Sequence, residues 1–172
     1  MCCGNERENT IQCPLDCEFL LEARKHEVTP AIDPKSIPNA DIRVTEDFLH
    51  AQSLLVATTG RLLFNAAMET AGAIDLDVRE ALASIIRTLR TLDSGLIYET
   101  RPQNTVAAAV QARFQGLLEE WRKSAAEQTG VHSVRDKDVL GSLVFWERME
   151  RGWNNGRRRS RAFLSQLRKA SE

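Results

Sequence analysis

The chain has 172 residues, of which 42% are apolar and 27% are charged, and its formal net charge is −1. These values are ordinary for one soluble globular domain, with room for a small appendage. No apolar run approaches the roughly 18 residues of a membrane span, and the N-terminal residues lack the apolar stretch of a secretory signal peptide. We therefore expect a cytoplasmic protein with no membrane partner.

The four cysteines all fall within the first 17 residues, at Cys2, Cys3, Cys13 and Cys17. Four thiolates are a standard ligand set for structural zinc and for iron–sulfur clusters. Reduced thiols in the cytoplasm are more often metal ligands than disulfides. The cluster therefore predicts a metal-binding module with zinc as its cofactor. An iron–sulfur cluster is the alternative, because Cys13 and the following proline resemble the Cys-Pro that ends the bacterial ferredoxin motif. A redox pair and unligated surface thiols remain open as well.

The predicted module covers residues 1–27 and includes a short helix that runs from about Asp16 to Glu27. Asp16 is suited to cap the start of this helix. Residues 28–44 follow, and they contain prolines at four-residue spacing: Pro30, Pro34 and Pro38. Because proline disrupts a helix interior, this stretch is predicted to run extended, as a strap that joins the module to the rest of the chain.

Helical periodicity dominates the remaining residues, 45–172. Apolar side chains in the clearest segment recur at alternating spacings of four and three residues, which indicates a helix packed on a neighbour. Short connections between long helices favour antiparallel neighbours. The sequence therefore predicts an all-α fold, an antiparallel helical bundle of four to five main helices with the small N-terminal Cys-rich metal-binding module attached. The expected helices are 45–71, capped by Thr45; 75–100; 104–128; 133–153, opened by Ser133 and Asp136; and 157–169.

Positive charge gathers near the C-terminus. The last 28 residues carry 8 Lys or Arg against 3 Asp or Glu, whereas the preceding residues carry 15 against 21. At the start of the last predicted helix, a group of arginines would oppose the helix dipole and would be stabilised by an anion. That anion is either a phosphate of a nucleic acid or nucleotide or the carboxylates of the acidic body, which the charge balance favours. The candidate anion-binding residues are Arg157, Arg158, Arg159 and Arg161.

The sequence contains no linear catalytic motif, such as a glycine-rich phosphate loop, a zinc-protease helix, a serine-hydrolase elbow or a di-iron pair. Asp75 and Asp77 are interpreted as helix caps rather than as catalytic acids. We therefore predict a non-enzymatic interaction or regulatory protein whose metal module or bundle face binds a protein partner or a second copy. Nucleic-acid or nucleotide binding through the arginine cluster and an iron–sulfur redox role are the alternatives.

Overall fold

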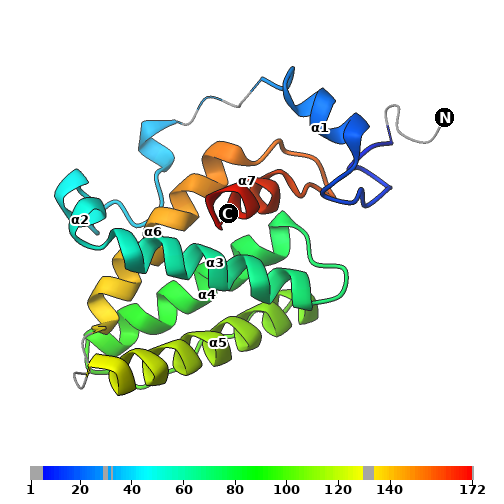
Figure 1. The fold of residues 1–172 in the computed structure, drawn as a ribbon. Coiled ribbons are helices and arrows are strands. Elements are labelled where there is room, and N and C mark those ends of the chain that lie inside the picture. The colour runs from blue at the N-terminus through cyan, green and yellow to red at the C-terminus, as the bar shows by residue number, and fades with distance from the viewer. Residues whose placement is uncertain (1–5, 29–30, 32, 130–133, 172) are drawn as a thin grey trace.

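The computed structural model describes residues 6–28, 31, 33–129 and 134–171 (Figure 1). Within these ranges the chain is all-helical and has no β-strand, which confirms the predicted all-α class. The elements are α1 (Glu18–Arg24), the 3-10 helix η1 (Pro34–Ser36), α2 (Glu46–Ala51), α3 (Ser53–Glu69), α4 (Asp75–Asp93), α5 (Thr105–Thr129), α6 (Asp136–Trp153) and α7 (Ala162–Ser171).

Four long helices form a closed bundle, in which α3 packs against α5 and α6, and α4 packs against the same two helices. α3 and α4 therefore lie diagonally across the bundle, although the connection between them is short. α7 lies mainly against α3 and α6. Apolar side chains from all five helices fill the core, and the largest that are fully buried are Leu63, Leu82, Ile86, Phe114, Leu143, Phe163, Leu164 and Leu167.

α4 ends at Asp93, well short of the prediction. Gly95 has a φ of +82°, and its N–H donates to the Leu92 carbonyl at 2.9 Å. The N–H of Leu96 donates to the Thr91 carbonyl, also at 2.9 Å. These two bonds form a Schellman cap, which requires a left-handed residue that glycine supplies with the least strain. The predicted end was wrong because the apolar spacing continues past this cap.

The chain then runs back along α4 through residues 94–104, here named the return segment (Figure 1). Hydroxyl groups of α4 hold it, because Thr100 N–H donates to Thr88 Oγ1 at 2.9 Å and Ser84 Oγ donates to the Thr100 carbonyl at 2.7 Å. Asn104 reaches Asp77 in the first turn of α4. α5 therefore starts at the same end of the bundle as α4, and the two helices are parallel. The prediction of antiparallel neighbours was wrong for this pair.

The predicted helix 45–71 divides at Gln52, whose φ of −109° and ψ of 23° separate α2 from α3. Thr45 caps α2 as predicted, since its side chain accepts a hydrogen bond from Phe48 N–H at 3.1 Å. The Phe48 ring packs against Gly141 of α6, where a Cβ atom would come within 2.7 Å of it. The break thus allows α2 to reach α6 while α3 enters the bundle.

α3 and α6 approach closely at Gly60, where an added Cβ atom would lie 2.8 Å from Trp146 Cε2. The indole N–H of Trp146 donates to the Val56 carbonyl at 3.0 Å and to Thr59 Oγ1 at 3.2 Å. Thr59 also shares a hydrogen bond with the Ser142 hydroxyl at 2.5 Å. These buried polar groups therefore all have partners, as close packing of two helices requires.

The described part of the strap lies over α6. It contains one helical turn, η1, where the prediction had only extended chain, and Asp33 accepts a hydrogen bond there from Lys35 N–H at 2.9 Å. Arg148 of α6 donates to the carbonyls of Asn39 and Ile42 at 2.8 and 2.9 Å. The strap is therefore fixed to the bundle through its backbone.

The same substitution at two helical glycines is expected to have opposite effects on stability. Gly60→Ala forces the Trp146 ring to move, and overpacking of this kind costs about 1–3 kcal/mol. Gly116→Ala in α5 meets nothing within 4 Å, so it should stabilise the protein by about 0.5–1 kcal/mol through helix propensity. Urea denaturation measures both values, and an equal effect at the two sites would contradict the described packing of α3 on α6.

Candidate functional sites

Two of the four predicted metal ligands, Cys2 and Cys3, lie outside the described residues. Cys13 is 3% exposed and Cys17 is half-buried, and both are free thiols. Cys17 rather than Asp16 occupies the N-cap position of α1, so the predicted cap was wrong. Within the described residues no three His, Cys, Asp or Glu side chains gather as a metal site.

A tight loop precedes Cys13. The Glu6 carbonyl accepts hydrogen bonds from the N–H groups of Asn9, Thr10 and Ile11 at 3.1, 3.2 and 3.3 Å. Arg7 and Ile11 also form an isolated backbone bridge. The bridge is parallel, so the chain runs in the same direction at the two ends of the loop, and these ends lie side by side.

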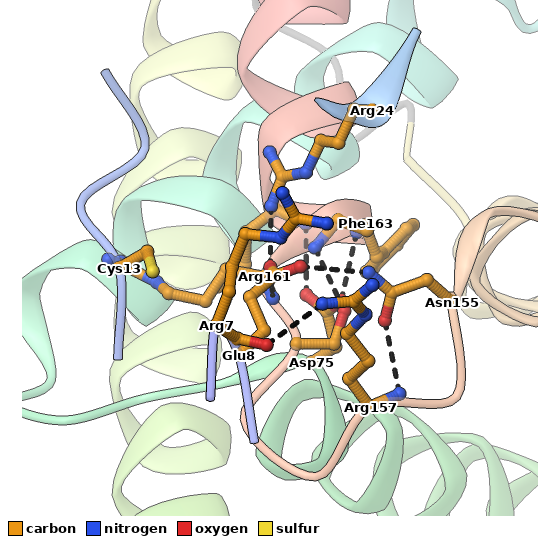
Figure 2. A network of polar contacts seen from close by, with 12 residues as sticks. Arg7, Glu8, Cys13, Arg24, Asp75, Asn155, Arg157, Arg161 and Phe163 are labelled. Carbon is orange, nitrogen blue, oxygen red and sulfur yellow. Dashed lines mark hydrogen bonds and ion pairs between the residues drawn. The ribbon is translucent and has the colours of Figure 1, made fainter. Parts of the chain in front are cut away.

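Glu8 of this loop is fully buried and has a φ of +56°. Its Oε1 accepts hydrogen bonds from the Arg24 side chain at 2.7 Å and from Arg161 N–H at 3.0 Å. Its Oε2 accepts one from Asn155 Nδ2 at 2.9 Å, and its carbonyl accepts one from Arg159 N–H at 2.7 Å. Figure 2 shows Arg24, Asn155 and Arg161 around the Glu8 carboxylate. Glu8 thereby joins the N-terminal loop, α1 and the segment before α7.

Asp75 is also fully buried, and it caps α7 rather than α4. Its Oδ2 accepts hydrogen bonds from Ser160 Oγ at 2.7 Å and from Phe163 N–H at 3.0 Å. Its Oδ1 accepts one from Leu164 N–H at 3.1 Å. Burial raises the pKa of Asp75 to about 6, against the opposing effect of these hydrogen bonds. Asp75 is therefore a cap, as predicted, but the helix that it caps is distant in the sequence.

A third buried carboxylate, Glu150, holds the start of the same segment. Arg79 donates to both of its oxygens, at 2.8 and 2.9 Å. Asn154 Nδ2 donates to Glu150 Oε1 at 2.9 Å. Glu8, Asp75 and Glu150 thus together fix residues 154–161, and each of these carboxylates has structural hydrogen-bond donors.

The predicted arginine cluster lies in this segment, because α7 begins at Ala162 and not at residue 157. Arg157 donates to the Arg7 carbonyl at 2.9 Å and lies 3.5 Å from Glu27. Arg161 is half-buried beside Glu8, and desolvation lowers its pKa. Both side chains therefore contribute to internal packing.

The other two arginines of the cluster, Arg158 and Arg159, have exposed side chains. Neither forms an ion pair or a side-chain hydrogen bond with another described residue. The structure thus divides the candidate anion-binding set into two internal arginines and two exposed ones. The cluster does not form one exposed basic patch.

The return segment displays large apolar side chains to solvent, a feature that the sequence analysis did not identify. Leu96 is 64% exposed, Ile97 is 95% exposed and Tyr98 is 68% exposed. We name these three residues the apolar knob. Leu92, just before the cap, is exposed as well. Three consecutive exposed apolar side chains form a concentrated patch, and such patches mark interaction sites more often than scattered ones do.

Two hollows adjoin the return segment. The first has a volume of about 210 Å³, and its wall combines Glu99 and Arg101 with the α5 residues Ala108, Gln111 and Ala112. The second, of about 450 Å³, lies between the other end of the segment and α4. One lining residue of the first hollow, Glu99, directly follows the apolar knob in the sequence.

The surroundings of the knob are fixed by hydrogen bonds. Thr91 Oγ1 donates to the Tyr98 carbonyl at 3.2 Å, and Gln111 Nε2 donates to the Thr100 carbonyl at 2.8 Å. Together with the Schellman cap at one end and the α4 hydroxyls at the other, these bonds hold the backbone on both sides of the exposed side chains.

No known protein family, no curated protein and no solved structure matches the chain. None of the described helices is both long and apolar enough to cross a membrane.

Removing the Glu8 carboxylate should destabilise the protein strongly. Glu8→Ala leaves the Arg24 guanidinium and two other donors without their acceptor, and breaking a buried pair costs about 3–5 kcal/mol. The matched control is Glu22→Ala, which removes an exposed pair with Lys25. Exposed pairs contribute only about 0.2–1 kcal/mol. Denaturant unfolding compares the two, and an equally small loss for both variants would contradict the described network.

Asp75 should add a distinctive pH dependence. Because its folded pKa lies above its unfolded value, the folded state binds the proton more tightly. The stability that this group contributes is therefore full at low pH and is lost as the pH rises through about 6. The difference in unfolding free energy between wild type and Asp75→Asn should grow by roughly 1.3 kcal/mol, in favour of wild type, from pH 7 to pH 5. Parallel pH profiles for the two proteins would refute this.

Proposed function

We propose that this protein is a non-enzymatic interaction protein that binds a protein partner through the apolar knob of Leu96, Ile97 and Tyr98. The observation that carries the proposal is the almost complete exposure of Ile97 between two exposed neighbours. Burying one such side chain in a partner is worth about 1.5–3 kcal/mol. The knob can therefore act as a hot spot, one of the few groups of residues that supply most of the binding free energy of an interface.

Preorganisation supports the same conclusion. The knob stands between the Schellman cap at Gly95 and the Thr100 amide, which donates to Thr88. A backbone already held in place loses less conformational entropy when a partner binds, and this increases affinity. A flexible apolar loop of the same composition would lack this advantage.

The buried carboxylates support a non-enzymatic role. A catalytic acid or base must reach a substrate proton. Glu8, Asp75 and Glu150 are instead enclosed by arginine, asparagine and backbone donors that hold the fold together. Their burial is explained by their structural role, because they hold the segment before α7 in place.

We also propose that Cys2, Cys3, Cys13 and Cys17 bind one structural zinc ion. The loop from Glu6 to Ile11 supports this, because its hydrogen bonds bring its two ends together on the N-terminal side of Cys13. Cys3 lies three residues before the loop and Cys13 two residues after it, and at about 3.5 Å per residue such lengths of chain can close one site. Zinc held by four thiolates has a structural role and leaves no position open for chemistry.

A photo-crosslinking residue at the knob tests the interaction directly. Ile97→p-benzoylphenylalanine should give a discrete crosslinked adduct in an extract of the source cells. The matched control carries the same residue at Leu54, which is 75% exposed on α3 but is far from the knob in sequence. The absence of an adduct at position 97, or equal adducts at both positions, would reject the knob as the binding surface.

Elemental analysis of protein purified with and without oxygen tests the metal. We expect one zinc per chain, which Cys13→Ser or Cys17→Ser should remove. His26→Ala is the control, because His26 is exposed at the end of α1 and pairs only with Glu22 among the described residues. Iron with visible absorbance would establish the iron–sulfur alternative instead. A protein with neither metal would refute the site altogether.

A further inference from the structure

We propose that Arg7, Arg24 and Arg161 bind a phosphate group, either inorganic phosphate or the phosphate of a small organic molecule. The site lies where the N-terminal loop, α1 and the segment before α7 meet. It does not depend on the apolar knob or on the proposed metal, because it uses other residues. Unpaired buried charge, buried N–H groups without acceptors and an adjoining hollow support it.

Two of these arginines carry charges that no carboxylate pairs with directly. Arg7 is half-buried, and its side chain forms no hydrogen bond or ion pair with another described residue. Arg161 is half-buried as well, and its side chain donates to Met68 Sδ at 3.2 Å but to no described carboxylate. A thioether is a weak acceptor. Burying a charge is costly unless an opposite charge accompanies it, and one dianion would balance both guanidinium groups.

Two buried carboxylates lie near these arginines, but both already have other donors. Glu8 pairs with Arg24 at 2.7 Å, and its other side-chain hydrogen bonds come from Asn155 Nδ2 and the Arg161 N–H. Asp75 accepts hydrogen bonds from a hydroxyl and from two backbone N–H groups, and burial raises its pKa to about 6. Neither carboxylate forms an ion pair with the Arg161 side chain, so an excess of positive charge remains.

The arginine N–H groups provide donors for an anion. Arg24 is only 12% exposed, and its Nε and Nη1 are buried with no acceptor among the described residues. The Nε atoms of Arg7 and Arg161 lack such an acceptor as well. A buried donor without an acceptor costs free energy. A phosphate group has several strong acceptor oxygens and a charge of about −1.5 to −2 at neutral pH, so it suits a group of guanidinium ions better than a carboxylate does.

The three arginines gather around Glu8 (Figure 2). Arg24 Nη2 and the Arg161 N–H donate to the same Glu8 oxygen, at 2.7 and 3.0 Å, and Arg7 directly precedes Glu8 in the chain. Desolvation is the main cause of the lowered pKa of Arg161, and repulsion from Arg24 adds to it. An anion bound among these guanidinium groups would offset their repulsion.

A hollow with a volume of about 90 Å³ reaches Arg24. One water-sized probe occupies roughly 10–15 Å³, so this volume admits a group as small as phosphate. The amide side chains of Asn155 and Gln166 also line the hollow. Glu27 lines it too, but its carboxylate lies 3.5 Å from Arg157, so its negative charge is balanced. The anion can therefore approach Arg24 through this hollow.

Phosphate binding to the purified full-length protein tests the site. Thermal unfolding is measured in inorganic phosphate and in glycerol 3-phosphate, each against sodium chloride and sodium acetate of equal ionic strength. A ligand that binds the folded state raises the melting temperature as its concentration increases. We expect such a rise with at least one of the phosphate compounds and none with chloride or acetate. The compound that binds more tightly distinguishes free phosphate from a phosphate ester as the ligand.

Arg7→Gln distinguishes a ligand-binding arginine from a structural one. It should weaken phosphate binding about tenfold or more, because it removes a hydrogen bond between charged groups, and calorimetric titration measures the dissociation constant. It should not lower the melting temperature of the phosphate-free protein, because the Arg7 side chain has no described partner to lose. The matched control is Arg158→Gln, which removes the same charge from an exposed side chain and should leave the dissociation constant unchanged.

The proposal is overturned if the phosphate compounds change the melting temperature no more than chloride and acetate do. It is also overturned if Arg7→Gln binds phosphate as tightly as wild type. An equal loss of affinity in Arg7→Gln and Arg158→Gln would contradict it, because general charge attraction would then explain the binding. A lower melting temperature of phosphate-free Arg7→Gln would show that Arg7 already has a structural partner, which likewise rejects the site.

Discussion

The Schellman cap at Gly95 is the constraint on which the topology of the bundle depends. A helix that continued to residue 100 would bring α5 in from the opposite end, and the two helices would be antiparallel. The cap instead turns the chain back along α4, where Ser84 and Thr88 bind its backbone. The reversal makes α4 and α5 parallel. It also places the apolar side chains after Gly95 on the surface rather than between packed helices. The parallel topology and the exposure of the apolar knob therefore have the same local cause.

The second organising interaction is the group of buried carboxylates at the other end of the molecule. Glu8 takes a left-handed backbone conformation, which is strained for a residue with a side chain. The strain is offset by four hydrogen bonds that join the N-terminal loop to α1 and to the segment before α7. A buried ion pair adds little net stability compared with apolar packing, but it defines which donors must meet it. Glu8 accordingly specifies how the two ends of the chain come together.

Much of the helical structure could be predicted from local signals, and most errors arose from contacts between distant residues. The Thr45 cap and the end of α6 at Trp153 follow from nearby residues, and Asp77 accepts the Ile74 N–H as a local cap should. Asp75, two residues earlier, is also an aspartate, yet it accepts hydrogen bonds from Phe163 and Leu164. Only the packing of α7 against the start of α4 reveals this pairing. The dipeptide Ser94-Gly95 was a local signal for the cap. The prediction instead followed the regular apolar spacing, which continues past Gly95. The apolar knob was not predicted, because the predicted helix ran past it to residue 100 and Leu96 continued the apolar spacing of that helix.

The hydrogen bonds of the return segment hold it in place, so that it presents the knob in a fixed conformation. Amide hydrogen exchange, measured by NMR on dilute protein, tests this most directly. The Leu96 and Thr100 amides donate to Thr91 and Thr88, whereas no described acceptor binds the Ile97 amide. We expect the Leu96 and Thr100 amides to be protected like those of the last turns of α4, and the Ile97 amide between them to exchange quickly. Exchange of all three amides at the rate of an unstructured chain would contradict it.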